Sequence, residues 1–196
     1  PLVLIPIYWL LFKSASRSET TPRLEYIFLL FAALWVAGQS MHLGTNSINN
    51  LSEKLAEQNT IDILNSAIYT LTYFYDEYLS HFLWHIGILG LAILLIYHEW
   101  RNPSGQRTIW WAAILGGVIH GFTYFTAFLE GQTTPLSYPV SILITAYILI
   151  FGRKKLSDHP VTAFFLITFL VTVLFFSGWR LYWKGFPGIF ESGLMK

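Results

Sequence analysis

Four histidines stand inside long apolar stretches of this chain, where a titratable side chain is costly and needs a partner. They are His42, His81, His85 and His120. An imidazole surrounded by hydrocarbon finds compensation most readily in a hydrogen bond, in water or in a metal ion. Neutral imidazole suits zinc, iron and copper, and two histidines four residues apart on one helix can ligate a single ion. The residue types and their spacing therefore predict a divalent transition-metal site.

Carboxylates lie close to these histidines, and a metal-assisted reaction would need one of them as a general base. Glu77, His81 and His85 recur at intervals of four residues, which places them along one side of a helix. Asp76 is rotated by about 100° from Glu77 on an α-helix, so we expect Glu77 to face the pocket. Glu130 ends another apolar segment near the same membrane boundary. The candidate catalytic residues are therefore Glu77 and Glu130.

The reaction depends on the metal, which the spacing leaves open. With zinc, three imidazoles leave a fourth position for water, which a carboxylate activates to hydrolyse an ester or amide. We expect His81, His85 and His120 as these ligands, with His42 as a further ligand or in contact with one. With iron or copper, the same residues would form a centre that activates oxygen. Both versions predict an enzyme, a hydrolase or an oxidase, that acts on a lipid or another apolar substrate.

Two other interpretations use the same polar residues differently. A haem b held between two histidines at matching depth would fit His85 with His120, although haem has no need of the carboxylates. An accessory or structural subunit of a larger membrane complex would use the polar side chains as a buried hydrogen-bond network. The other two histidines, His98 and His159, lie beside charged residues at a membrane boundary. We expect ordinary interfacial solvation for both.

The composition requires a membrane around these residues. Of 196 residues, 54% are hydrophobic, 18% aromatic and only 12% charged, against about 25% charged in a soluble domain. This composition excludes a soluble enzyme. The formal net charge of +1 leaves no basic excess for nucleic-acid phosphates, and the absence of cysteine excludes disulfides and thiolate metal sites. The expected partners are membrane lipid and other membrane subunits, and no nucleic acid.

Hydrophobic runs predict an all-α, polytopic integral membrane helix bundle of about six transmembrane helices. The first span, residues 1–12, is too short for a hydrocarbon core of about 30 Å, and we expect it to be truncated. The third span, residues 76–98, has an apolar extension before it that lies along the interface or projects beyond it. Residues 46–65 are polar, with apolar residues at helical spacing, and predict an interfacial helix. The other spans are expected over residues 24–44, 110–130, 135–152 and 161–183, in one transmembrane domain of residues 1–196.

Basic residues predict the orientation, because they concentrate in the loops after the first, third and fifth spans. These loops are expected in the cytoplasm. His85 and His120 then lie about 18 Å above the inner boundary at about 1.5 Å per residue, and the other two intramembrane histidines lie further out. We expect one pocket in the outer half, open to the extracytoplasmic side, with residues 185–196 folded over it. Gly117 and Gly121 should allow a neighbouring helix to approach closely. The basic loop residues are Lys13, Arg17, Arg23, Arg101, Arg107, Arg153, Lys154 and Lys155.

Overall fold

The computed structural model describes residues 1–15, 20–58, 63–189 and 191–193 of the chain. All secondary structure in this part is helical, and five helices are long and apolar enough to cross a membrane. The predicted all-α fold is confirmed, and the chain is an integral, multi-pass membrane protein. Apolar side chains such as Trp111 and Leu181 are exposed on the outside of the bundle, where lipid covers them. Arg17 and residues 59–62, which belong to predicted loops and to the predicted outer segment, lie outside the described residues.

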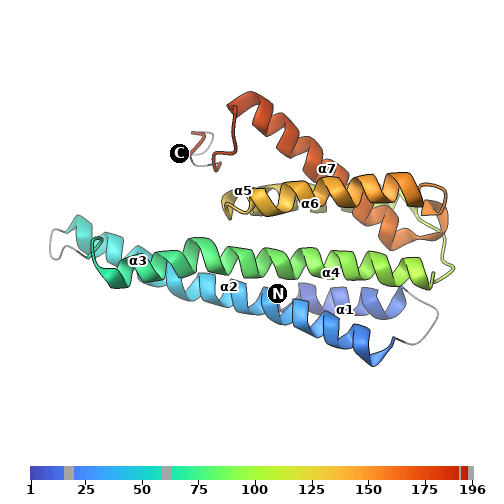
Figure 1. Cartoon of the computed structure of the whole chain (residues 1–196), viewed down its shortest axis with the longest axis horizontal. Helices are drawn as coiled ribbons and strands as arrows, with labels where there is room; N and C mark the ends of the chain where they lie inside the picture. The colour runs from blue at the N-terminus through green and yellow to red at the C-terminus, as the bar shows by residue number, and fades with distance from the viewer. Residues whose placement is uncertain (16–19, 59–62, 190, 194–196) are drawn as a thin grey trace.

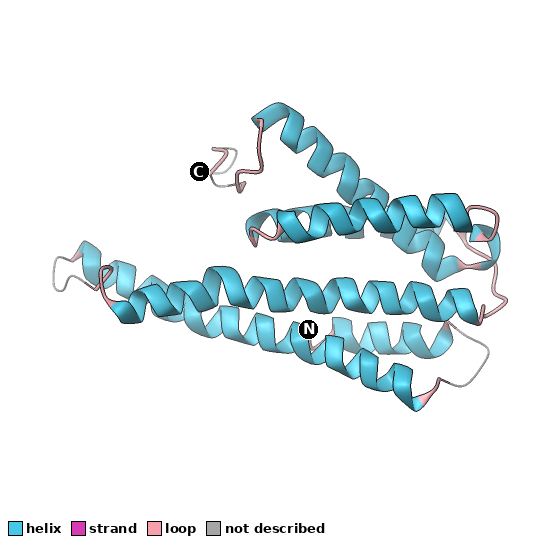
Figure 2. Ribbon diagram, viewed as in Figure 1, coloured by secondary structure: helices cyan, strands magenta, loops and turns pink. Residues whose placement is uncertain are grey.

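The helices form two lobes that lie side by side (Figures 1 and 2). We call the interface between the lobes the seam. The first lobe contains α1 (Leu4–Ser14), α2 (Pro22–Glu57), α3 (Ala67–Tyr73), the π-helical segment η1 (Phe74–Ser80) and α4 (His81–Arg101). The second lobe contains α5 (Trp110–Glu130), α6 (Thr134–Tyr147), the π-helical segment η2 (Ile148–Gly152), the short 3-10 helix η3 (Leu156–Asp158) and α7 (Pro160–Trp183).

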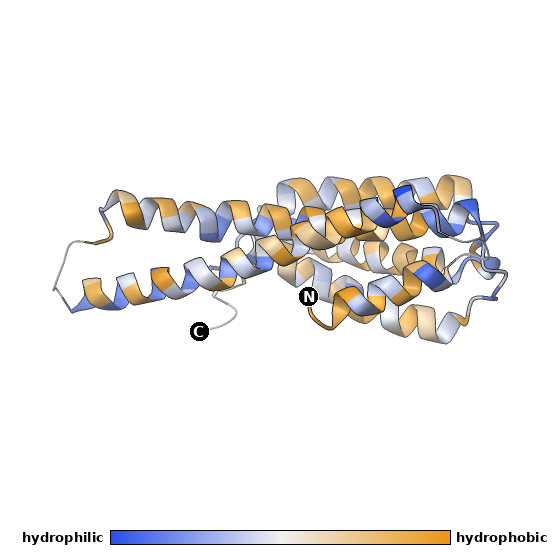
Figure 3. Ribbon diagram, turned by 90° about the horizontal axis from the view of Figure 1, so that it is seen from below, coloured by the Kyte–Doolittle hydropathy of each residue, from blue (hydrophilic) through white to orange (hydrophobic). Residues whose placement is uncertain are grey.

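Two helices of the first lobe are much longer than a bilayer is thick. The α2 helix has 36 residues, and α3, η1 and α4 together form one continuous rod of 35 residues. At about 1.5 Å per residue each rod covers about 50 Å, against a hydrocarbon core of about 30 Å. Their far ends, residues 46–57 and α3, therefore project beyond the other helices as an arm (Figure 3). No proline interrupts α2 after Pro22, so residues 46–57 continue this helix, and the predicted separate interfacial helix is replaced by the arm.

Backbone contact joins α2 to α4. A Cβ atom on Gly38 would lie 2.4 Å from the Ser80 carbonyl oxygen and from the Trp84 backbone nitrogen. A Cβ atom on Gly87 would lie 2.6 Å from the Phe31 carbonyl oxygen. Each helix thus places a glycine against the backbone of the other, which lets polar side chains one turn away meet across the interface.

The close approach predicted at Gly117 and Gly121 is confirmed, and the neighbouring helix is α7. A Cβ atom on Gly121 would lie 2.4 Å from the Thr168 carbonyl oxygen, and one on Gly117 would lie 2.8 Å from Cβ of Ile167. The Thr172 hydroxyl donates a 3.0 Å hydrogen bond to the Gly121 carbonyl oxygen. This contact holds the second lobe together.

A buried carboxylate joins the two lobes at the end of the bundle opposite the arm, which we call the basic end. Glu99 of α4 accepts hydrogen bonds from the backbone N–H groups of Val161 (2.9 Å) and Thr162 (2.7 Å) and from the Thr162 hydroxyl (2.7 Å). The first N–H groups of a helix have no partner within it, and they favour negative charge. Glu99 therefore caps α7 from the other lobe.

Candidate functional site

A buried carboxylate at the root of the arm gathers four polar side chains, and we call these five residues the Asp76 cluster. The Asp76 side chain lies in η1 and is 1% exposed. It accepts hydrogen bonds from Asn49 Nδ2 (2.9 Å) and Thr45 Oγ1 (3.2 Å). Its Oδ1 also lies 2.8 Å from Nδ1 of His42, and Thr72 donates a 2.9 Å hydrogen bond to Asn49 Oδ1. Every oxygen of this carboxylate is therefore in contact with a polar atom of α2.

The prediction that Glu77 rather than Asp76 faces the pocket is wrong, because Asp76 is the carboxylate that contacts His42. Asp76 is buried, whereas the Glu77 side chain is only partly buried. The reason is the π-helical segment η1, since a π-helical turn contains an extra residue and shifts the register by one relative to an α-helix. Glu77 contributes its backbone instead, because its carbonyl oxygen lies 2.9 Å from Nδ1 of His81.

Three of the four predicted histidines form a row, which we call the imidazole row. The ring centroids of His42 and His81 are 4.6 Å apart, and those of His81 and His85 are 6.0 Å apart with nearly parallel rings. In each ring an oxygen atom contacts Nδ1: the Asp76 carboxylate, the Glu77 carbonyl and, at 2.5 Å, the Thr133 hydroxyl. His85 is fully buried, and its Nε2 has no hydrogen-bond partner among the described residues.

The fourth histidine, His120, lies apart from this row. Its Nε2 is 3.0 Å from the Tyr8 hydroxyl, which is also 3.0 Å from the Tyr124 hydroxyl. We call Tyr8, His120 and Tyr124 the seam trio, because α1 meets α5 there. The expectation that His120 shares a pocket with the other imidazoles is therefore wrong. Matching depth along two helices does not fix the direction in which each side chain points.

The predicted ligand set is thus not assembled. In residues 1–15, 20–58, 63–189 and 191–193, no three His, Asp or Glu side chains are placed so that they could hold one metal ion. The two histidines that the haem alternative needs are also separated. His85 lies against Phe128 and Thr133, while His120 lies against Tyr8 and Tyr124. Whether the protein binds a metal stays a prediction.

Glu130, the second predicted base, is hydrogen-bonded to the C-terminal tail. Its carboxylate accepts a short hydrogen bond from the backbone N–H of Ile189. Trp179 donates a 3.0 Å hydrogen bond to the Pro187 carbonyl oxygen, and the Phe186 ring packs on Tyr138. The tail therefore folds back on α5, α6 and α7 as far as its described residues show.

Two histidines at the basic end are buried, which makes the prediction of ordinary solvation wrong. His98 is 1% exposed, its ring centroid lies 4.7 Å from that of Phe12 with the two rings tilted, and neither nitrogen has a partner among the described residues. His159 is 6% exposed, and its Nδ1 lies 2.9 Å from the Lys155 carbonyl oxygen. Both rings are packing elements of the basic end.

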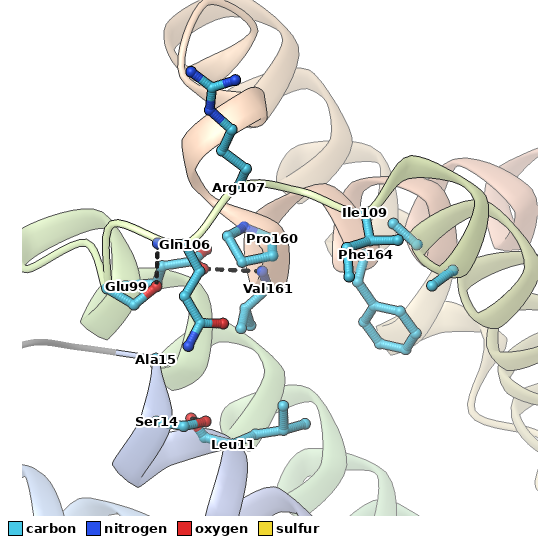
Figure 4. Close-up of a pocket in the computed structure, with 13 residues that line it drawn as sticks. Leu11, Ser14, Ala15, Glu99, Gln106, Arg107, Ile109, Pro160, Val161 and Phe164 are labelled. Atoms are coloured by element: carbon cyan, nitrogen blue, oxygen red, sulfur yellow. Dashed lines mark hydrogen bonds between the residues drawn. The ribbon is translucent and has the colours of Figure 1, made fainter.

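Two pockets lie in the seam. The first, which we call the seam pocket, has a volume of about 320 Å³ and lies next to the imidazole row. The second, at the basic end, has a volume of about 360 Å³. In the second pocket the Glu99 carboxylate is already bonded to α7, and the Arg107 side chain points away from the other labelled residues (Figure 4). The residues lining the seam pocket are Pro1, Leu4, Tyr8, Trp35, Gln39, Trp84, Ile88, His120, Thr123, Tyr124, Ala127 and Phe128.

Half of the residues that line the seam pocket carry an aromatic ring, and three lining residues hold a buried polar atom without a partner among the described residues. Nε1 of Trp35, Oε1 of Gln39 and Nε1 of Trp84 are buried and have no hydrogen-bond partner among the described residues. Trp35 and Trp84 were given no role from the sequence, and Tyr8 was missed because the first span was assigned only as a partial span. The signal available was Gln39, which stands one helical turn before His42 inside an apolar segment.

The comparisons with known proteins give distant relatives over most of the chain. It is 26% identical to the ceroid-lipofuscinosis neuronal protein 6 homolog of Canis lupus familiaris and 25% identical to ceroid-lipofuscinosis neuronal protein 6 of Homo sapiens. Each alignment covers 92% of this chain, which spans only 64% of the relative's length. No protein-family model and no solved structure matches the chain.

Proposed function

We propose that this protein binds an uncharged amphipathic lipid in the seam pocket. One observation carries the proposal: Trp35, Gln39 and Trp84 line the pocket and hold buried polar atoms that no described residue satisfies. An unpaired buried polar group costs about 1–3 kcal/mol. A headgroup that bonds to these atoms, after a small rotation of the side chains, would recover that cost.

The pocket wall sets the chemistry of the headgroup. None of the residues lining the pocket is Lys, Arg, Asp or Glu, so a charged headgroup would stay uncompensated. The two indoles offer N–H donors, and the Gln39 amide oxygen offers an acceptor. A hydroxyl that both accepts and donates fits this set, as in a diacylglycerol. The aromatic wall and a volume within the range of about 300–1,000 Å³ are typical of small-molecule sites.

The seam trio closes the pocket on the side of α1. Tyr8 and Tyr124 are each 4% exposed, and His120 can donate or accept a hydrogen bond depending on its tautomer. Because Tyr8 bonds to two residues of α5, the trio keeps α1 against the second lobe. Its expected role is to hold the wall of the pocket.

A quenching experiment tests the proposal. Bromine atoms on a diacylglycerol quench nearby indoles, and two of the eight tryptophans line the pocket. The protein in phosphatidylcholine nanodiscs is titrated with brominated diacylglycerol, alongside Ala127→Phe, which fills the pocket, and Ala33→Phe, whose side chain is exposed on α2. We expect saturable quenching in the wild type and in Ala33→Phe but not in Ala127→Phe. Equal, non-saturating quenching in all three would contradict the proposal.

A metal centre on the imidazole row is the second candidate, and it would add a reaction on such a lipid. The observation that favours it is the oxygen atom at Nδ1 of His42, His81 and His85. Metal-binding histidines are usually oriented in this way, which leaves Nε2 for the ion. His42 and His81 would be the first two ligands, and His85 would need to move to become a third. Zinc would give a hydrolase, and iron or copper an oxidase.

Metal analysis separates this candidate from the others. Mass spectrometry of purified wild type, His81→Ala and His120→Ala would give the metal content per chain. The metal candidate expects stoichiometric metal that is lost in His81→Ala and kept in His120→Ala, which lies outside the row. A metal-free wild type that copurifies with fixed partners would instead favour an accessory subunit of a membrane complex.

The orientation is part of the same proposal: the basic end faces the cytoplasm and the arm faces the opposite side. The chain has no cysteine, so single cysteines report on accessibility without interference. In whole cells, Ser47→Cys on the arm should react with an impermeant maleimide, and Asn102→Cys at the basic end should react only after permeabilisation. The reverse pattern would invert the assignment.

A further inference from the structure

An open groove runs between α4 and α6 near the basic end. Its volume is about 820 Å³, which exceeds that of either seam pocket. Ile93 and Tyr97 on one side and Leu143, Tyr147 and Ile150 on the other are all exposed. The groove is therefore apolar and open to the surrounding lipid.

The floor of the groove is formed by well-packed side chains. Ile96 is 7% exposed and Ile148 is fully buried. The floor ends at Gly152, where a Cβ atom would lie 2.6 Å from the Trp100 ring. Ile96 and Ile148 therefore form the bottom of the space between α4 and α6, and the exposed side chains listed above form its sides.

Cationic side chains stand at the end of the groove. Arg101 lines it and is exposed, and Nζ of Lys155 lies 5.2 Å from the centroid of the Trp100 ring. Among the described residues, neither cation forms an ion pair with a carboxylate. An apolar groove that ends at unpaired cations is complementary to a molecule with a hydrocarbon chain and an anionic head.

We propose that this groove binds one acyl chain of an anionic phospholipid, with its phosphate at Arg101 and Lys155. Basic pockets between transmembrane helices are suited to anionic headgroups, and each cation near an anionic lipid contributes about 1 kcal/mol, or about a fivefold preference. The groove shares no residue with the seam pocket and prefers the opposite kind of headgroup. The two proposals therefore stand or fall separately.

Native mass spectrometry tests the site. The protein is released from detergent in the presence of equal amounts of phosphatidylglycerol and phosphatidylcholine with identical acyl chains. We expect the wild type to retain phosphatidylglycerol in preference, and Arg101→Gln and Lys155→Gln each to reduce that preference about fivefold. Arg107→Gln is the matched control, because it removes the same charge from the same end and Arg107 is not among the residues that line the groove.

A second pair of variants tests the acyl chain. Ala146→Phe fills the groove and should reduce retention of both lipids, whereas Ala33→Phe on the exposed face of α2 should not. Free glycerol phosphate should not displace the lipid, because it lacks the chain. Equal retention of the two lipids by the wild type, or an equal loss of preference in Arg107→Gln, would overturn the proposal.

Discussion

The Asp76 cluster and the seam trio are both hydrogen-bonded groups inside the helical bundle, but they differ in what they leave unpaired. In the Asp76 cluster, both carboxylate oxygens contact side chains of α2. Around the seam trio, the neighbouring Trp35, Gln39 and Trp84 retain polar atoms without partners among the described residues. The first group lies within one helical hairpin and pairs both oxygens of its carboxylate, and the second borders a pocket between lobes.

The presence of unpaired buried polar atoms distinguishes a binding site from a stabilising network better than residue type does. Histidine occurs in both groups, and Asp76, a buried carboxylate beside a histidine, is fully paired within the first group. Buried polar groups in native structures are paired in the great majority, so an unpaired one needs an explanation. A ligand is the explanation that we favour at the seam pocket.

The largest effect is expected from removing the carboxylate of the Asp76 cluster. Asp76→Ala leaves His42 and Asn49 without their common partner, and we expect the free energy of unfolding to fall by about 3 kcal/mol. Glu77→Gln, the neighbouring residue, should change it by less than about 0.5 kcal/mol. Unfolding in mild detergent, followed by circular dichroism, measures both. A larger loss in Glu77→Gln would mean that the two carboxylates have been assigned in the wrong order.

The next effect tests the backbone contact that positions the cluster. In Gly38→Ala the new methyl group would overlap backbone atoms of α4, and we expect a loss of about 1–3 kcal/mol in the free energy of unfolding. Gly44→Ala is the control, because nothing lies within 4 Å of its Cβ position. Alanine there should be neutral or slightly stabilising. Equal destabilisation by both substitutions would argue against contact between the helices.

The smallest effect on stability, with a clear effect on binding, is expected at the seam trio. Tyr8→Phe removes a hydroxyl that bonds to His120 and Tyr124, and we expect a loss of about 1 kcal/mol in the free energy of unfolding. Because α1 is then less firmly held, saturable quenching by brominated diacylglycerol should weaken in the same variant. If Tyr8→Phe lowered the free energy of unfolding as much as Asp76→Ala does, the seam trio would contribute as much to stability as the Asp76 cluster.

The fold class and the long apolar helices could be predicted from the sequence because hydrophobic runs and helical spacing are local properties. The same holds for the close contact at Gly117 and Gly121, where small residues repeat on one face. The glycine pair of α2 and α4 is less visible, since Gly38 and Gly87 lie on different segments and only the packing of the two helices brings each against the other's backbone.

The site was harder to predict, because it depends on how each helix is rotated about its axis. Depth along the membrane can be counted from the sequence, and this count placed His120 with the other three intramembrane histidines. In the structure His120 lies apart from them. The π-helical segment η1 added a shift of one residue that no α-helical periodicity contains, and it exchanged Asp76 for Glu77. Tyr8 came from a short helix whose position depends entirely on tertiary contacts.

The unbroken length of α2 has a mechanical consequence. The same helix carries residues 46–57 of the arm and two residues that line the seam pocket, Trp35 and Gln39, and it is fixed to α4 by direct backbone contact. Proline, the commonest cause of a sharp kink, does not occur in α2 after Pro22, so a displacement of the arm is expected to move the part of α2 that lines the seam pocket. A partner that binds the arm would therefore act on the seam pocket from a distance of about 20 Å, at about 1.5 Å per residue along the helix.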